Sequence, residues 1–379
     1  MPGSVYLDYN ATAPIRPEAE AAVLHALRLG GNPSSVHAAG RAARAAIEKA
    51  RAEVGALVAT PRGSVVFMSG AAEANALAIH SAIAHGTRRL IVSAIEHETV
   101  QETAKACGVE VDYLPVDRRG VADVAWLKDR LARRDATDGA PFVALMLANN
   151  ETGVIQPVAE AGALVREAGG WMHVDAVQAA GKIAIDQKAL FADTLSLSAH
   201  KLGGPAGVGA LVFGNRARLV RQLHGGGQER SVRAGTENVS GIAGFGAAAA
   251  ASKTPVDQSA WRDSCAERLV REAGVTVIGE GAPRLGQTLC FAAPGFPSDL
   301  QVMQMDLAGV MVSAGSACSS GKVKASKAVA AMGHDDLAPY VLRISSGWAS
   351  TDADWRVFTD AWLKAHAHHR LRHAAQPAA

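Results

Sequence analysis

The stretch that decides the fold and the chemistry of this chain is Thr194-Leu195-Ser196-Leu197-Ser198-Ala199-His200-Lys201-Leu202-Gly203-Gly204. Its first part, residues 194–197, is apolar and β-prone, which predicts a short buried strand. Lys201 follows the end of that strand and precedes a glycine turn. Burial at such a position lowers the pKa of a lysine amine and makes it a nucleophile for carbonyl groups. The alternative is an ordinary surface lysine in a loop.

A second predicted strand, Trp171 to Asp175, ends in an acid. An acid and a lysine at neighbouring strand ends are the pair that pyridoxal phosphate requires. The lysine binds the aldehyde of the cofactor, and the acid keeps the pyridine nitrogen protonated, so that the ring can accept electrons. The two strand ends together therefore favour a buried lysine over a surface one.

Apolar runs of strand length alternate with Ala-, Arg- and Glu-rich stretches of helical spacing, such as 41–58 and 158–168. This alternation predicts a mostly parallel sheet covered on both faces, with ligands bound at the carboxyl ends of its strands. The runs that we interpret as its strands are Val65–Met68, Leu90–Ser93, Val109–Tyr113, Phe142–Leu147, Trp171–Asp175, Thr194–Leu197 and Gly209–Phe213.

The pattern changes after an Ala-rich helix, Gly241 to Ser252, at Lys253-Thr254-Pro255. Beyond it we expect an α+β domain whose strands are 275–278, 287–291, 310–313 and 341–345. We therefore expect a large domain over residues 14–253 and a small domain made of 1–13 and 254–379. The histidine-rich segment 364–379 is interpreted as a solvated helix end rather than a metal site.

The bulk composition is that of a soluble globular protein. The chain has 379 residues, 49% hydrophobic and 20% charged. A net charge of +2 and an aromatic content of 5% give no support to a nucleic-acid or membrane partner. The four cysteines form no C-x-x-C pair, and the N-terminus has no signal-peptide pattern. We therefore expect a cytoplasmic location, where a thiol can be catalytic.

Three further segments carry polar groups at strand ends. Ser69-Gly70-Ala71-Ala72 precedes a helix whose first N–H groups can bind a phosphate, with Ser198 and His200 as further donors. His97 follows another strand, and a histidine there can stack on a cofactor ring or move protons. Asn150 and Gln178 can donate to a ring oxygen. Taken singly, each of these has a structural alternative, such as a turn-forming asparagine.

Two residues of the C-terminal part complete the set. Cys318 lies in the small-residue loop Ser313 to Gly321, which leaves a thiol accessible, and Lys322 and Lys324 favour its thiolate. Cys290 lies inside a predicted strand, so we expect it to be a buried, unreactive side chain of the core. Arg343 lies in an apolar strand, where its guanidinium can bind a substrate carboxylate or form a structural ion pair.

Taken together, these residues resemble the cysteine desulfurases of the class V aminotransferase superfamily, in the branch with an extended cysteine loop. The motifs that carry this resemblance run almost from end to end: Tyr6–Pro14, Gly31–His37, Glu96-His97, Asn149–Glu151, His173–Gln178, Ser198–Lys201, His224–Glu229, Arg233–Thr236, Gly315–Cys318 and Arg343. The resemblance implies a fold-type I, pyridoxal-phosphate-dependent α/β fold, with a large, mostly parallel seven-stranded sheet domain and a smaller α+β domain.

The resemblance also implies a role for each residue. Lys201, His97 and Cys318 would be catalytic, with Lys201 holding pyridoxal phosphate, His97 stacking on its ring and Cys318 acting as nucleophile. Asn32, Asn150 and Arg343 would position the substrate or the ring. The remaining cofactor contacts would come from Ala71, Ala72, Asp175, Gln178, Ser198, His200 and, from the neighbouring subunit of a homodimer, Thr236.

The implied activity removes sulfur from L-cysteine, giving L-alanine and a persulfide on Cys318. The persulfide would pass to an iron–sulfur scaffold or a sulfur carrier. No resident metal is expected, with Cys318 only a transient cluster ligand. Ala72 departs from the usual threonine, which removes a hydroxyl bond to the phosphate worth about 1.5–3 kcal/mol. The rival functions are a selenocysteine lyase or another class V aminotransferase and, from a different class, a non-catalytic scaffold.

Overall fold

The computed structural model describes residues 4–315 and 325–374. Its large sheet has seven strands in the order β2-β8-β7-β6-β5-β3-β4. Six of these strands run in one direction, and β8 is antiparallel to both of its neighbours. The mostly parallel seven-stranded sheet is therefore confirmed. Its strands are β2 (Val65–Met68), β3 (Arg89–Ser93), β4 (Glu110–Leu114), β5 (Phe142–Ala144), β6 (Trp171–Asp175), β7 (Thr194–Ser198) and β8 (Gly209–Phe213).

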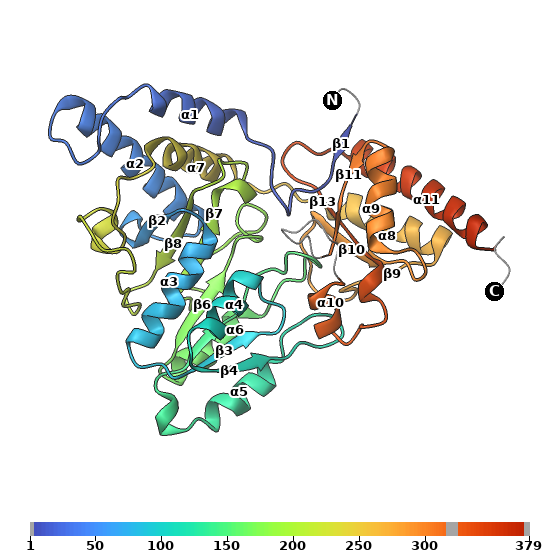
Figure 1. Ribbon diagram of the computed structural model, residues 1–379, viewed down its shortest axis with the longest axis horizontal. Coiled ribbons are helices and arrows are strands. Elements are labelled where there is room, and N and C mark those ends of the chain that lie inside the picture. Colours follow the sequence, from blue (N-terminus) through green and yellow to red (C-terminus); the bar gives the residue numbers. More distant parts are fainter. Residues whose placement is uncertain (1–3, 316–324, 375–379) are drawn as a thin grey trace.

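Helices cover both faces of this sheet (Figure 1). Along β3, Ile91 packs into the cluster on one face, while Leu90 and Val92 pack into the cluster on the other. Because successive side chains of a strand point to opposite faces, a strand buried on both sides is apolar throughout. One face is covered by α2 (Ala38–Leu57), α5 (Val124–Ala132), α6 (Val158–Glu167) and α7 (Val239–Ala251), and the other by α3 (Ala71–Ala84) and α4 (Glu98–Ala106).

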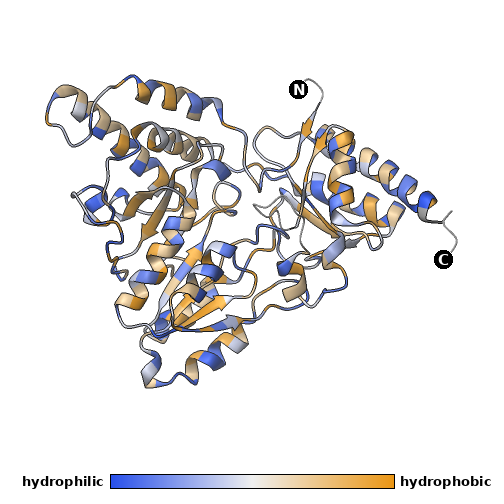
Figure 2. Ribbon diagram, viewed as in Figure 1, coloured by the Kyte–Doolittle hydropathy of each residue, from blue (hydrophilic) through white to orange (hydrophobic). Residues whose placement is uncertain are grey.

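Figure 2 shows this pattern by colour: most strands of the large sheet are hydrophobic, whereas hydrophobic and hydrophilic residues alternate along the helices. Helix α1 (Pro17–Leu27) packs on α7, outside this layer. Short 3-10 turns join several elements: η1 (Arg62–Ser64), η2 (Ala136–Asp138), η3 (Ala199–Lys201), η4 (Glu229–Ser231) and η5 (Ala338–Tyr340).

A second, antiparallel sheet has the order β12-β13-β10-β9, and β1 pairs in parallel with β11 beside it. The N-terminal strand thus lies among C-terminal elements, as Figure 1 shows. The elements of this part are β1 (Val5–Tyr6), β9 (Thr276–Val277), β10 (Thr288–Ala292), β11 (Val310–Met311), β12 (Ser313–Ala314), β13 (Val341–Ser345), α8 (Ser259–Ala273), α9 (Ser298–Leu307), α10 (Lys327–Ala331) and α11 (Asp352–Ala374).

Three sequence expectations differ from the structure. The predicted strand 310–313 is divided into β11 and β12, which belong to different sheets. The strand predicted over 142–147 is shorter in the structure, where β5 ends at Ala144. The N–H groups of Leu145 and Leu147 still donate to carbonyl oxygens of β6, but the regular strand pairing does not continue past Ala144. The prediction that the histidine-rich segment is a solvated helix end is wrong for His366. This residue is 9% exposed, and its ring stacks on that of Trp362 with the two ring centroids 4.9 Å apart. No helix in the described part of the chain is long and apolar enough to cross a membrane.

Candidate active site

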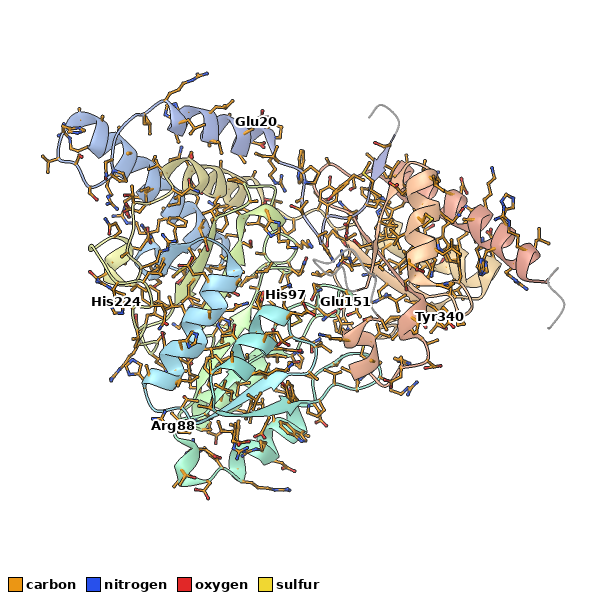
Figure 3. All side chains as sticks on the ribbon, viewed as in Figure 1. Glu20, Arg88, His97, Glu151, His224 and Tyr340 are labelled. Atoms are coloured by element: carbon orange, nitrogen blue, oxygen red, sulfur yellow. The ribbon has the colours of Figure 1, made fainter. Side chains whose placement is uncertain are left out.

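A cavity of about 530 Å³ lies where the strands of the large sheet end, next to β13 of the small sheet. His97 and Glu151, both labelled in Figure 3, line it from the large-sheet side. Since β2 runs parallel to β7, the start of α3 also reaches this edge. Ten residues singled out in the sequence line the cavity: Ala71, Ala72, His97, Asn150, Asp175, Gln178, Ser198, His200, Lys201 and Arg343.

Two other residues singled out in the sequence, Asn32 and Thr236, lie away from the cavity among the described residues. Asn32 is exposed in the connection between α1 and α2, where its side chain accepts from the N–H of Ser34. Thr236 is exposed as well. Neither is among the described residues that line the cavity. Cys318, with Lys322 and Lys324, lies outside the residues that the structure describes.

Lys201 points its amine at two carbonyl oxygens of the N-terminal segment. Nζ donates to the carbonyl oxygens of Asn10 and Ala11, the second at 2.7 Å. Burial and the nearby Arg343 lower the pKa of the Lys201 amine to about 8. With this pKa about one tenth of the amine is uncharged at pH 7, far more than for an ordinary lysine, and the uncharged form is the one that reacts as a nucleophile. The turn after it needs Gly203, whose φ of 84° is left-handed.

Asp175 accepts two hydrogen bonds at the end of β6. The backbone N–H of Val177 donates to Oδ1 at 3.0 Å, and Asn75 Nδ2 donates to Oδ2 at 3.1 Å. The Asn75 oxygen in turn accepts from His173 Nε2 at 3.0 Å. Burial lowers the pKa of His173 to about 3, so that this imidazole is neutral and donates from one nitrogen only. These two donors, one to each carboxylate oxygen, hold the Asp175 side chain in one orientation at the edge of the cavity.

The same asparagine connects Asp175 to His97. Asn75 Nδ2 also donates to Thr99 Oγ1, which is 3.0 Å from His97 Nδ1. The backbone N–H of Thr99 donates to that nitrogen too, at 3.2 Å, so His97 caps the start of α4. Because Nδ1 accepts, a neutral His97 carries its proton on Nε2. The imidazole is thereby fixed in one tautomer and can exchange a proton through Nε2.

The start of α3 offers backbone donors to an anion. Its N-cap is Gly70, which has no side-chain cap, so the first N–H groups of the helix remain open to a ligand. Gly209 lets β8 approach this turn, since a Cβ there would lie 2.7 Å from the Gly70 backbone. Ser198 and His200 line the same cavity, and burial lowers the pKa of His200 to about 4. His200 is therefore a neutral hydrogen-bonding group.

Arg343 forms the ion pair that the sequence left open as an alternative to a substrate clamp. Its Nη2 donates to Asp8 Oδ1 at 2.7 Å, and its Nη1 donates to the carbonyl oxygen of Asn150 at 3.1 Å. Only 4% of the residue is exposed, and its Nε is buried without a partner among the described atoms. Arg343 still lines the cavity, and three of its five N–H hydrogens, including the one on Nε, have no recorded partner among the described atoms.

The sequence reasoning assigned no role to Asn75 or to two buried acids, Glu96 and Glu151. Burial and Asp175 raise the pKa of Glu96 well above its usual range, and burial also raises the pKa of Glu151. Glu151 accepts from Ser326 Oγ at 2.6 Å, and one Glu96 oxygen accepts from the N–H of Met146. Their positions in the sequence could have identified them as site residues, because all three follow strands whose ends were predicted to form the site.

Of the cysteines that the structure describes, none has the surroundings of a nucleophile. Cys290 is fully buried in β10, as its strand position predicted. Burial raises the pKa of Cys290 and raises that of Cys265 to about 12. Cys107 is partly exposed, and burial raises its pKa as well. A raised pKa keeps a thiol protonated and unreactive.

Comparison with known proteins agrees with this site. The model of the family "Aminotransferase class-V" matches residues 5–358. The cysteine desulfurase IscS of Dictyoglomus turgidum is 36% identical over 93% of this chain and 92% of its own. A cysteine desulfurase of Cereibacter sphaeroides is 40% identical over 86% of both chains.

The solved structures lead to the same group. The structure of a NifS-like protein from Rickettsia africae has a TM-score of 0.88 and 29% identity, covering 96% of this chain and 99% of its own. The structure titled "SspA in complex with cysteine" has a TM-score of 0.79 and 28% identity, covering 91% of this chain and 99% of its own. The chain therefore belongs to the class V aminotransferase family and, within it, to the cysteine desulfurases.

Proposed function

We propose that this chain removes the sulfur of L-cysteine, releasing L-alanine and leaving a persulfide on Cys318. The observation that carries the proposal is the placement of the Lys201 amine, the Asp175 carboxylate and the free start of α3 in one cavity. A lysine, an acid and an anion site at one sheet edge are the groups that hold pyridoxal phosphate.

The residues present fit that cofactor. Lys201 would hold its aldehyde carbon, Asp175 its pyridine nitrogen, and the N–H groups at Ala71 and Ala72 its phosphate. Ser198 and His200 would add donors to the phosphate, Gln178 and Asn150 would face the ring oxygen, and His97 would stack on the ring. When bound, the cofactor withdraws electrons from the α-carbon of the substrate, which weakens its bonds.

The side chains of this protein would supply the proton transfers and the sulfur acceptor. Lys201, with a pKa lowered to about 8, can accept the α-proton of the substrate and return it. His97 can exchange a proton through Nε2. Cys318 would accept the substrate sulfur: its S–S bond forms as the substrate C–S bond breaks, and the carbon takes up a proton. The N–H groups of Arg343 that have no recorded partner would hold the substrate. The contact expected of Asn32 would have to be made across a subunit boundary, because Asn32 does not line the cavity of its own chain.

Two assignments concern the assembly. The exposed position of Thr236 supports a homodimer in which it contacts the cofactor phosphate of the partner subunit. The persulfide would then pass to an iron–sulfur scaffold or a sulfur-carrier protein. The pairing of β1 with β11 supports the division into a large domain, 14–253, and a small domain made of 1–13 and 254–379.

The test incubates the purified chain with L-cysteine and a reductant, then counts sulfide and alanine. We expect equal amounts of the two products, a visible absorption band that is lost in Lys201→Ala, and a mass increase of one sulfur on the Cys318 peptide before reduction. The matched control is Cys107→Ala, which should leave both products unchanged. Sulfide release that survives in Cys318→Ala would refute the persulfide role.

A further inference from the structure

A second lysine lies beside the cavity. Lys182 follows Gln178 by four residues in the turn after β6, and its Nζ donates to Gln178 Oε1 at 2.9 Å. The same amine donates to Asn10 Oδ1 at 2.6 Å. In the described part of the chain, Lys182 forms no ion pair with a carboxylate. Lys182 is thus a lysine amine held by two amide oxygens.

This contact determines how the Gln178 amide is turned. The Lys182 amine donates in both contacts, and its protonated form has no acceptor, so the part of Gln178 that faces it is the amide oxygen. Gln178 Nε2 is then directed the other way and donates to the carbonyl oxygen of Asn10 at 2.9 Å. An amide nitrogen carries two hydrogens, so one remains for a ligand in the cavity that Gln178 lines.

Asn10 depends much less on Lys182 than Gln178 does. Its backbone N–H donates to Ser345 Oγ at 2.9 Å, and its side-chain nitrogen donates to Thr288 Oγ1 and to the carbonyl oxygen of Asn150, both at 3.1 Å. The side chain of Gln178 has two recorded partners, Asn10 and Lys182. Loss of Lys182 therefore frees the amide of Gln178 while Asn10 stays in place.

We infer that Lys182 is a positioning residue for the cofactor, which holds Gln178 with its amide nitrogen toward the ring oxygen. The inference rests on the proposed function, since it assumes that the cavity binds pyridoxal phosphate. Without Lys182 the amide can turn and present its oxygen to an electron-rich ring oxygen, which repels it. Burial, Lys201 and Arg343 lower the pKa of Lys182 to about 7, but an uncharged amine keeps two N–H donors, enough for both bonds.

The experiment measures the dissociation constant of pyridoxal phosphate by fluorescence titration into cofactor-free protein. Lys182→Met should raise this constant about tenfold, the equivalent of one hydrogen bond to a charged group. Lys182→Arg, which keeps the donors, should restore it to within about threefold of the wild type. The matched control is Lys188→Met, at an exposed lysine of the same segment, which should leave the constant unchanged.

A double-mutant cycle separates positioning of Gln178 from a general structural effect. In a Gln178→Ala background, Lys182→Met should change the dissociation constant less than twofold, because the amide that it positions is gone. The inference is overturned if the two effects multiply, or if Lys182→Met behaves like Lys188→Met. If Lys182→Met does not fold, Lys182→Gln takes its place in the cycle. A wild-type chain that takes up no pyridoxal phosphate would instead refute the proposed function.

Discussion

The buried ion pair between Arg51 and Glu229 should contribute more to stability than any exposed pair of this protein. Their side chains are 2% and 3% exposed, and the pair is bidentate, with N···O distances of 2.7 and 2.8 Å. Glu229 also accepts from the backbone N–H of Phe67 at 2.8 Å, inside β2. The pair therefore connects α2 to η4, and through the N–H of Phe67 it also connects η4 to β2.

The perturbation is Glu229→Ala. It leaves a guanidinium in a site without its carboxylate, and the N–H of Phe67 without its acceptor. Removing one partner of a buried pair lowers the free energy of unfolding by about 3–5 kcal/mol. Arg51 keeps hydrogen bonds to Glu48 and to the carbonyl oxygen of Val65, which favours the lower half of that range.

The assay is urea denaturation followed by tryptophan fluorescence, with the slope m compared between variants. The matched control is Glu53→Ala, which breaks the pair with Lys253, whose side chain is 42% exposed and that of Glu53 29%. Exposed pairs contribute about 0–1 kcal/mol, so this variant should unfold almost like the wild type. The double variant Arg51→Met with Glu229→Ala should lose less than Glu229→Ala alone. Equal losses in Glu229→Ala and Glu53→Ala would refute the reasoning.

Three further predictions concern pH, the cofactor and the backbone. The pKa of His173 is about 3 in the folded protein and about 6.5 in the unfolded chain. As the pH falls below 6.5 the unfolded chain therefore takes up a proton that the folded protein does not, and the free energy of unfolding decreases until the pH reaches about 3. Between pH 7 and pH 5 the wild type should lose about 2 kcal/mol more than His173→Gln, measured by urea denaturation; parallel curves would contradict this. Ala72→Thr should lower the dissociation constant of pyridoxal phosphate about tenfold or more by restoring a hydroxyl donor, whereas Ala76→Thr, one turn along α3, should not. Ser231 has a left-handed φ of 62°, so Ser231→Gly should stabilise the protein by about 0.5–1 kcal/mol. Ser240→Gly, in the first turn of α7, relieves no such conformation and should not stabilise it.

The sheet and the position of the site follow from the sequence for one physical reason. Strands buried on both faces are apolar throughout, so they stand out from the helices between them. In a parallel sheet their carboxyl ends share an edge, and the groups after those ends, such as Asp175 and Lys201, must meet there. The predicted strand 142–147 ends three residues later than β5 does, because the residues after Ala144 are still apolar although the regular strand pairing has ended.

The hydrogen-bond partners of these groups could not be predicted in the same way. Asn75, Lys182 and Asn10 each act through polar atoms that lie about 3 Å from their partners, and the sequence pattern and strand order do not determine positions with that precision. Arg343 illustrates the difference. Its burial in a strand required a partner for the charge, yet only the structure identifies Asp8, which comes from the other end of the chain.

Asn10 shows why these contacts matter for the reaction. It lies in the N-terminal segment that runs with the small sheet, and its backbone oxygen accepts from both Lys201 and Gln178. Its N–H groups are bound by Ser345 and Thr288 on the other side. A shift of the small sheet would therefore move the acceptor of the Lys201 amine, because the same residue is tied to both parts. The two sheets must keep one relative position for this lysine to be held in place, although among residues 4–315 and 325–374 no strand of one sheet pairs with a strand of the other.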